Sequence, residues 1–387
     1  MCIRRFAIAI ALLFSLNSPE AWTQAFTAVS KRIQTPTRAS ETPNTQAPTS
    51  LMNLSGPILG LIFDSSKSGL RPIYGIPGAS RLGKVWVLGR EIQRAWISSL
   101  QDYALVESKS DGSLALVSFG KGAILIRSIK GVAGGVGNIS LSTKGGVAAL
   151  YYPTARGVQF VSGLPDTPQV SPFIAFPAIP QSATAMAVSD DGEAVLLATT
   201  EQNGALVLLT RDGQSRVLTL LGKASSISFF PGTHNALVAD EQSNAVLLVQ
   251  DVTGAAITST LAGSREGIGR PVAVEASEDN RFAFVANGDS HTISTLDLHS
   301  GKISSLACNC TPTGLYRLSG NSVFRLNELS DANLQVLDAR AAEPRVLFVP
   351  ADANRTGLAG GTVPDRGQSR PIQTRPAKST QEGLLRR

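Results

Sequence analysis

The sequence of 387 residues predicts an all-β fold. Short apolar runs separated by turn residues recur through its middle, and no long helical periodicity interrupts them. Four such runs make one unit, and the units recur about every 40 to 48 residues. The clearest units cover residues 185–220, 226–261, 272–306 and 314–349, and two weaker ones begin at Ala95 and Asn138.

A period in the forties with four β-runs per unit is typical of a β-propeller. One four-stranded sheet cannot bury both of its faces, whereas several sheets packed radially bury them between neighbours and leave only short edges. Besides the six units there is one hairpin-like piece, Pro57–Gly78. The sequence therefore predicts a β-propeller of six to seven four-stranded blades over residues 55–350. Seven blades with an incomplete first blade is the favoured count.

One unit resembles a known repeat. The stretch RFAFVANGDSHTISTLDLHSGKI, residues 281–303, resembles the YVTN-type propeller repeat, in which a tetrad, a polar loop, an apolar strand ending near Asp and a Gly turn follow one another. Phe284 to Asn287 occupy the tetrad, and Asp297 and Gly301 occupy the later positions. The resemblance implies a fold rather than an activity, because that family includes surface-layer and periplasmic binding modules, lactonase-like enzymes and haem-associated oxidoreductase domains.

The N-terminus has the layout of an export signal over residues 1–25. Arg4 and Arg5 precede the apolar run Phe6–Leu16, and Thr23–Ala25 offers small residues for cleavage after Ala25. We expect a periplasmic or extracellular protein with no membrane span after cleavage; the alternative is an uncleaved anchor. Residues 26–54 predict a flexible linker and residues 351–387 a disordered basic tail, because both lack apolar periodicity.

The formal net charge of +6 belongs to the flanking segments. Residues 351–387 contain seven basic and three acidic residues, whereas residues 51–350 have a net charge of −1. A neutral globular region without interleaved aromatic and basic residues has no electrostatic footprint for nucleic acid. The sequence therefore excludes nucleic acid as an expected partner.

The loop between the second and third strands of each unit should lie on the propeller rim where ligands usually enter. In four units these loops are rich in carboxylates and amides, which suit a hard cation such as Ca²⁺ or another polar ligand. The alternative is that they are simply solvated loops. The candidate rim residues are Glu201, Asp240, Glu241, Asn287, Asp289, His291, Asn327, Glu328 and Asp331.

Cys308 and Cys310 are two residues apart, and three states remain open for them: a strained disulfide, two buried thiols, or a metal or redox site. No catalytic residue can be assigned. The three histidines show no metal-ligand spacing, and neither a Gly-x-Ser-x-Gly elbow nor a haem-attachment Cys-x-x-Cys-His occurs. We therefore expect no cofactor, with Ca²⁺ as the one alternative.

These observations favour an exported, non-catalytic and monomeric propeller that binds a protein, glycan or other polar ligand at its loop-rich rim. Two alternatives remain open. One is a lactonase-like or other propeller hydrolase that uses carboxylates and a divalent metal at the mouth. The other is a structural protein of the cell envelope, tethered by its flanking segments.

Overall fold

The structure is a computed structural model, and it describes residues 57–351 except 121–122, 178, 180–181, 201–203, 331 and 341–342. The chain divides into two compact units, Met1–Thr49 and Ser50–Arg387, and every strand named below lies in the second. The expected signal peptide and linker, and the tail beyond Ala351, lie outside the described residues.

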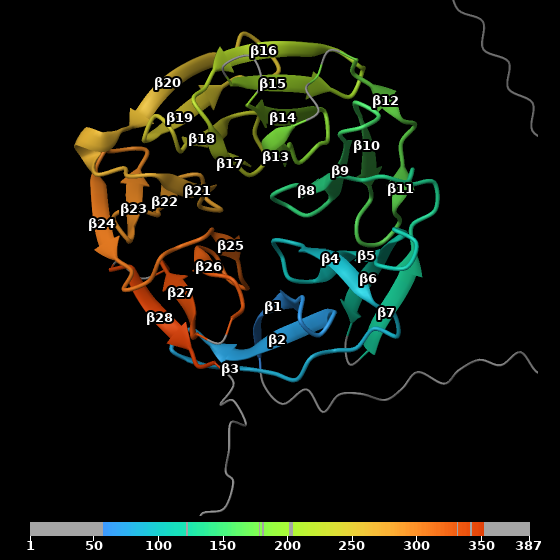
Figure 1. The fold of residues 1–387 in the computed structure, drawn as a ribbon. Helices are drawn as coiled ribbons and strands as arrows, with labels where there is room; N and C mark the ends of the chain where they lie inside the picture. The colour runs from blue at the N-terminus through green and yellow to red at the C-terminus, as the bar shows by residue number, and fades with distance from the viewer. Residues whose placement is uncertain are drawn as a thin grey trace, which may run out of the picture. The chain divides into compact units, whose positions relative to one another are not determined.

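Within the described residues the strands form seven antiparallel sheets arranged as a ring (Figure 1), which we call blades 1 to 7 in chain order. Blade 1 contains β1 (Ile58–Asp64), β2 (Gly69–Ile76) and β3 (Ala79–Leu82). Blade 2 contains β4 (Ile92–Ile97), β5 (Tyr103–Ser108), β6 (Leu114–Gly120) and β7 (Ala123–Ser128). Blade 3 contains β8 (Asn138–Leu141), β9 (Val147–Tyr152), β10 (Gly157–Ser162), β11 (Gln169–Val170) and β12 (Ile174–Ala175).

The remaining four blades each contain four strands in sequence order. Blade 4 contains β13 (Ala183–Val188), β14 (Ala194–Thr199), β15 (Ala205–Thr210) and β16 (Ser215–Leu220). Blade 5 contains β17 (Ala224–Phe229), β18 (Ala236–Asp240), β19 (Ala245–Gln250) and β20 (Ile257–Ala262). Blade 6 contains β21 (Pro271–Ala276), β22 (Phe282–Asn287), β23 (Thr292–Asp297) and β24 (Ile303–Ala307). Blade 7 contains β25 (Tyr316–Arg317), β26 (Val323–Arg325), β27 (Leu334–Asp338) and β28 (Arg345–Val349).

The first strand of every blade lies nearest the axis of the ring (Figure 1). The prediction of a propeller with seven blades and an incomplete first blade is confirmed. The hairpin predicted at Pro57–Gly78 supplies β1 and β2, and blade 1 adds only the short β3 to it. Blade 3 also differs from the four-stranded pattern. Its outer position is divided between two short strands, β11 and β12, which both pair with β10.

Burial explains why the inner strands of the blades are apolar throughout rather than alternating between apolar and polar residues. Every residue of β5, β9 and β14 is buried, because a neighbouring blade covers each face of the sheet. The outermost strand β16, with the sequence SRVLTL, is largely exposed and is rich in polar residues. The apolar core is accordingly divided into seven clusters of described residues, each between two adjacent blades.

The ring closes between blades 1 and 7 without a shared sheet. Leu59 and Ile62 of β1 pack in one cluster with Leu318, Val323 and Val349 from the last blade. The Ser319 N–H donates a hydrogen bond of 2.7 Å to the Leu59 carbonyl, which links β1 to the turn that follows β25. Closure therefore depends on side-chain packing and a small number of hydrogen bonds across the junction.

The helical content of the described part of the chain is very small. It includes the 3₁₀ turn Ser264–Glu266 between blades 5 and 6. Among the residues that the structure describes, no helix is long and apolar enough to cross a membrane.

Candidate functional site

A cavity of about 1180 Å³ follows the axis of the propeller, and we call it the central channel. The innermost strands of all seven blades contribute to its wall, including Leu61 from β1, Trp96 from β4 and Ser140 from β8. In blades 2 to 7 the turns after the innermost strands lie at one end, which we call the turn rim, and β1 of blade 1 begins at this end. The loops between second and third strands lie at the other end, which we call the loop rim. The cavity is large enough for an oligosaccharide or a short peptide.

Two of the predicted rim residues are buried and hold their own loops together. The Asp240 carboxylate accepts the N–H groups of Gly222 at 2.8 Å and Lys223 at 3.0 Å, and the Ser243 hydroxyl at 2.7 Å. Burial alone would raise the pKa of Asp240, but these donors outweigh it and hold the pKa below its ordinary value. Asn287 is fully buried and bonds Gly269 and Ser294.

Four less buried rim residues are also engaged with neighbours on the loop rim. Glu241 pairs with Lys223 at 2.9 Å, and Asp289 pairs with the Nε of Arg270 at 2.5 Å. His291 lies within hydrogen-bond distance of the Cys310 carbonyl and the Thr311 hydroxyl. Asn327 closes its own loop, because its amide bonds the Asn333 carbonyl and the Gln335 N–H.

Glu328 is the one predicted rim residue, among those described, that lines the central channel. Its carboxylate accepts a hydrogen bond of 3.0 Å from Nη1 of Arg325. The Arg325 guanidinium lies 4.0 Å from the centre of the Tyr316 ring, so the three side chains form one cluster at the loop-rim mouth. Burial and the Glu328 carboxylate raise the pKa of Tyr316 to about 12.

The predicted residues do not gather into one cation site in the part of the chain that is described. Asp240, Asp289 and Glu328 each have separate partners on blades 5, 6 and 7, as set out above. No three acidic, histidine or cysteine side chains of residues 57–351, leaving aside the gaps, lie close enough together to hold a metal ion. Glu201 and Asp331, the other two predicted rim residues, lie outside the described residues.

Cys308 and Cys310 form a disulfide in this structure, with their Cα atoms 5.0 Å apart. The bridge follows β24 and lies in the connection to blade 7. Asn309 between the two cysteines adopts a left-handed φ of 50°, which turns the backbone back on itself and lets neighbouring side chains meet. Of the three states that the sequence leaves open, the structure has the disulfide.

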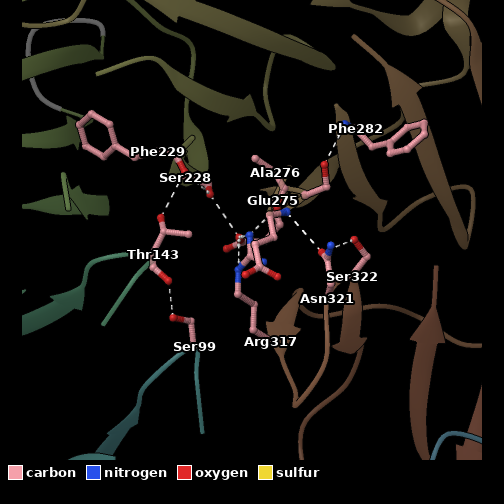
Figure 2. A network of polar contacts seen from close by, with 12 residues as sticks. Ser99, Thr143, Ser228, Phe229, Glu275, Ala276, Phe282, Arg317, Asn321 and Ser322 are labelled. Atoms are coloured by element: carbon pink, nitrogen blue, oxygen red, sulfur yellow. Dashed lines mark hydrogen bonds and ion pairs between the residues drawn. The ribbon is translucent and has the colours of Figure 1, made fainter. Parts of the chain in front are cut away.

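Polar side chains also cross the channel near the turn rim (Figure 2). Arg317 of blade 7 donates to the Glu275 carboxylate of blade 6 through Nη2 at 2.8 Å and Nε at 3.1 Å. The Ser228 hydroxyl of blade 5 donates to the same carboxylate at 3.2 Å. The Thr143 hydroxyl of blade 3 donates to the Phe229 carbonyl at 3.2 Å, and the Ser99 hydroxyl of blade 2 donates to the Thr143 carbonyl.

Gln101 completes this circuit. Its Nε2 donates to the Arg317 carbonyl at 2.7 Å, and its Oε1 accepts the Leu61 N–H of blade 1 at 2.8 Å. We call Ser99, Gln101, Thr143, Ser228, Glu275 and Arg317 the polar ring. Blade 4 joins its neighbours on the same rim, because the Asp190 carboxylate accepts the N–H groups of Lys144 at 2.6 Å and Gly232 at 2.7 Å.

Glu275 has an unusual electrostatic environment for an acid in an innermost strand. Its side chain is only 22% exposed, and that of Arg317 is 15% exposed. Burial raises the pKa of Glu275 above its ordinary value, and the charge and hydrogen bonds of Arg317 oppose this only in part. The pair therefore fixes blade 6 to blade 7 rather than leaving a carboxylate free in the channel.

Arg94 of β4 is a further charged residue in the channel wall. Its guanidinium donates to Glu107 at 2.6 Å and to the carbonyls of Gly137 and Val136 at 2.6 and 2.7 Å. It also lies 5.0 Å from the centre of the Trp96 ring. These hydrogen bonds fix the connection from blade 2 to blade 3. They also hold the Arg94 guanidinium over the Trp96 ring, where a cation–π interaction is favourable.

The sequence reasoning missed the channel residues Glu275, Arg317 and Arg94, although a signal for them is present. Each interrupts the first apolar run of its unit, in VAVEAS, LYRLS and IQRAWI. In blade 4 the Ser189 N–H donates to the Ala194 carbonyl across the first turn, and in blade 6 the Ser277 N–H donates in the same way to the Phe282 carbonyl. Ser189 and Ser277 are therefore equivalent positions. Two residues earlier in each blade, Glu275 occupies the position that Ala187 has in blade 4. A charge at a position that is alanine in another blade indicates a channel residue.

The fold and the channel define this protein as a seven-bladed β-propeller with a polar central channel. No protein-family model and no curated protein matches the chain. Among solved structures it is similar to virginiamycin B lyase from Staphylococcus aureus, with 13% identity and a TM-score of 0.49 over 67% of this chain and 83% of that one.

Two other solved structures are similar to a comparable degree. One is a functionally unknown protein from Desulfotomaculum acetoxidans, with 15% identity and a TM-score of 0.49 over 64% of this chain and 78% of that one. The other is hydrazine synthase from Kuenenia stuttgartiensis, with 11% identity and a TM-score of 0.48 over 81% of this chain and all of that one. At such identities and TM-scores the likenesses carry no argument about function.

The structural role of the rim carboxylates can be tested with a matched pair of substitutions. Asp240→Asn should lower the free energy of unfolding by about 2 to 3 kcal/mol, because whichever oxygen becomes an amide then faces a backbone donor. Asp289→Asn should lower it by less than about 1 kcal/mol, because that ion pair is exposed on the surface. Urea unfolding measures both, and equal effects from the two changes would contradict this assignment.

The raised pKa of Glu275 predicts a pH-dependent contribution to stability. Its folded pKa lies above the ordinary value of 4.5, so the folded state binds this proton more tightly than the unfolded chain. The contribution is present below pH 4.5 and is lost as the pH rises through the folded pKa. Relative to Glu275→Gln, the wild type should therefore lose unfolding free energy as the pH rises above about 4.5, until the folded pKa is passed. A flat or rising difference in urea unfolding across that window would disprove the assignment.

Proposed function

We propose that the protein is an exported, non-catalytic β-propeller that binds an acidic oligosaccharide in its central channel. The ligand enters from the loop rim, because the polar ring crosses the channel near the turn rim. The resemblance of residues 281–303 to the YVTN repeat supports this proposal, because that family includes binding modules of the cell envelope.

The observation that carries the proposal is the charge of the channel wall. The lining contains five cationic side chains and three carboxylates: Lys67, Arg71, Arg94, Arg317 and Arg325 against Asp64, Glu275 and Glu328. The surrounding residues 51–350 have a net charge of −1. Positive charge is therefore concentrated in the channel, where low-dielectric walls strengthen its attraction for an anion.

The mouth at the loop rim has the groups that such a ligand needs. Arg325 uses Nη1 for Glu328 and the Asn327 carbonyl, which leaves its Nε and Nη2 without a partner among the described residues. Tyr316 adds an aromatic ring there, and Trp96 adds another deeper in the channel wall; each is held against an arginine. Guanidinium groups bind carboxylates, and ring faces provide apolar contact for a sugar.

Binding is preferred to catalysis because the one channel carboxylate with a raised pKa is engaged. Glu275 accepts hydrogen bonds from Arg317 and Ser228, which tie three blades together. A general acid or base must instead reach the proton of a bound substrate. The geometry of Glu275 therefore supports a structural role within a binding protein.

Export is part of the proposal and rests on two observations. The residues up to Ala25 have the pattern of a cleaved signal, and Cys308 and Cys310 form a disulfide of the kind that persists in oxidising compartments. N-terminal sequencing of protein recovered from cell fractions should find Phe26 first, outside the cytoplasm. Recovery of the chain in the cytoplasm with Met1 intact would refute export.

Ligand binding can be tested with a tetrasaccharide of galacturonic acid and neutral maltotetraose as its control. Isothermal titration calorimetry should show the acidic sugar bound at least about tenfold more tightly. Arg325→Gln should weaken its binding about ten- to a hundredfold, because one charged hydrogen-bonding group is lost.

A channel-filling variant separates the channel from the outer surface. Ser140→Trp places a large ring in the channel wall and should abolish binding, whereas Ser304→Trp on the exposed outer strand β24 should leave binding unchanged. Thermal melts confirm that both variants fold. Equal affinity for the two sugars, or binding that survives in the folded Ser140→Trp variant, would contradict the proposed function.

A further inference from the structure

Blade 1 has no innermost strand in the part of the chain that is described. In blades 2 to 7 the first strand runs toward the turn rim, whereas β1 begins at that rim, where Leu59 and Leu61 bond the first turns of blades 7 and 2. β1 therefore occupies the second strand position, and β3 occupies the outer one beside β28 (Figure 1). The inner edge of β1 consequently faces the central channel, whose wall includes Leu61 and Phe63.

This inner edge presents unpaired backbone groups to the channel. Phe63 lies opposite Leu70 of β2, and Leu70 exchanges its hydrogen bonds with Trp86 on the far side. Because bonded pairs alternate along an antiparallel ladder, the N–H and C=O of Phe63 point away from β2, as do those of Leu61 two residues earlier. The Leu61 N–H is bonded to Gln101. The Leu61 carbonyl and both backbone groups of Phe63 have no hydrogen-bond partner among the described residues.

The open part of the edge is too short for another strand. At its turn-rim end the Leu61 N–H is already bonded, and a Cβ added to Gly60 would lie 2.5 Å from Cδ2 of Leu318 and 3.3 Å from Oε1 of Gln101. Side chains of blades 7 and 2 therefore close over this end. One donor and two acceptors remain, within about 7 Å along the strand. Such a set suits hydroxyl groups, each of which can both donate and accept.

Two cationic side chains line the channel at the loop-rim end of β1. Lys67 lies in the loop from β1 to β2, is exposed and forms no ion pair with another described residue. Arg325 of the adjacent blade 7 has two nitrogens without a partner, as described above. The Asp64 carboxylate at the end of β1 is buried and already accepts the Ser66 hydroxyl at 2.6 Å. A ligand that has both carboxylates and free hydroxyls matches these groups.

We propose that the inner edge of β1 is the subsite that selects a uronic acid oligosaccharide with free hydroxyl groups. Sugar hydroxyls donate to the carbonyls of Leu61 and Phe63 and accept the Phe63 N–H, while the ligand's carboxylates lie near Lys67 and Arg325. A sugar of equal charge whose hydroxyls are blocked has no donors for the two carbonyls. This inference rests on the proposed function, because it concerns the same channel and the same ligand.

The first test compares the tetrasaccharide of galacturonic acid with its O-acetylated form, which keeps the carboxylates and lacks the hydroxyl donors. In isothermal titration calorimetry with the full chain, the acetylated sugar should bind at least about tenfold more weakly, since two hydrogen bonds to carbonyls are lost. Equal affinity for the two sugars overturns the subsite and leaves the proposed function standing. Absence of binding by both sugars overturns the two together.

A matched pair of substitutions at Phe63 locates the subsite. Phe63→Ala and Phe63→Pro both remove the ring, but only proline removes the N–H that faces the channel, and it leaves the ladder to β2 intact. Phe63→Pro should therefore bind the unmodified tetrasaccharide about threefold to tenfold more weakly than Phe63→Ala. Thermal melts confirm that both variants fold. Equal affinity of the two folded variants overturns the subsite.

Amide hydrogen exchange tests the same N–H in the unmodified protein. Ala198 is the reference, because it also stands one residue before the end of its strand and pairs with Ala185 of the innermost strand β13. Without sugar, Phe63 should exchange at least about tenfold faster than Ala198, and saturating tetrasaccharide should slow Phe63 at least about tenfold while Ala198 is unchanged.

Two results of this exchange measurement would overturn the subsite. Protection of Phe63 in the sugar-free protein would mean that another part of the chain covers the edge. Unchanged exchange of Phe63 in protein that calorimetry shows to be saturated would place the sugar elsewhere in the channel, and the proposed function would stand without this subsite.

Discussion

The polar ring that crosses the central channel is the constraint on which the arrangement of blades depends. Blades 1 and 7 share no strand, so side-chain packing between them is supplemented by hydrogen bonds that cross the junction. Gln101 spans that junction, since it accepts the Leu61 N–H of blade 1 and donates to the Arg317 carbonyl of blade 7. Arg317 continues through Glu275 to Ser228, and so joins blades 5, 6 and 7.

This arrangement separates the two ends of the channel in function. The turn rim is occupied by side chains that satisfy one another, and burying them is tolerated because each polar group has a partner. The loop rim has the unsatisfied donors of Arg325 beside the ring of Tyr316 in the channel wall. A ligand therefore meets free polar groups only from that side. The carboxylates farther out on the loops, such as Asp240 and Asp289, hold the loops in place.

The fold could be predicted from the sequence because it is specified locally and repeatedly. Each unit contains its four strands and its first turn within about forty residues, and the buried strands are continuous apolar runs such as AVLLAT of β14. The incomplete first blade could also be predicted, because the hairpin Pro57–Gly78 precedes six units that each have four runs.

The channel could not be predicted in the same way, because single residues from distant units build it. Glu275 and Arg317 are 42 positions apart, and Gln101 and Arg317 are 216 positions apart. Polar loop residues attract attention in a sequence, yet most of those described here satisfy their own loops. Asp240 is an example, because its carboxylate accepts hydrogen bonds from backbone N–H groups. In the sequence such an aspartate cannot be distinguished from one that binds a ligand. Only the geometry distinguishes them.

Native-state amide hydrogen exchange at Leu61, compared between wild type and Gln101→Ala, tests the central claim most directly. Both residues at position 101 carry a Cβ at the observed left-handed φ of 61°, so backbone strain is matched. The account predicts that the Leu61 N–H is protected in the wild type and exchanges at least about tenfold faster in the variant, while Leu196 in blade 4 keeps its protection. Unchanged exchange at Leu61 in Gln101→Ala would contradict the claim that the polar ring closes the propeller.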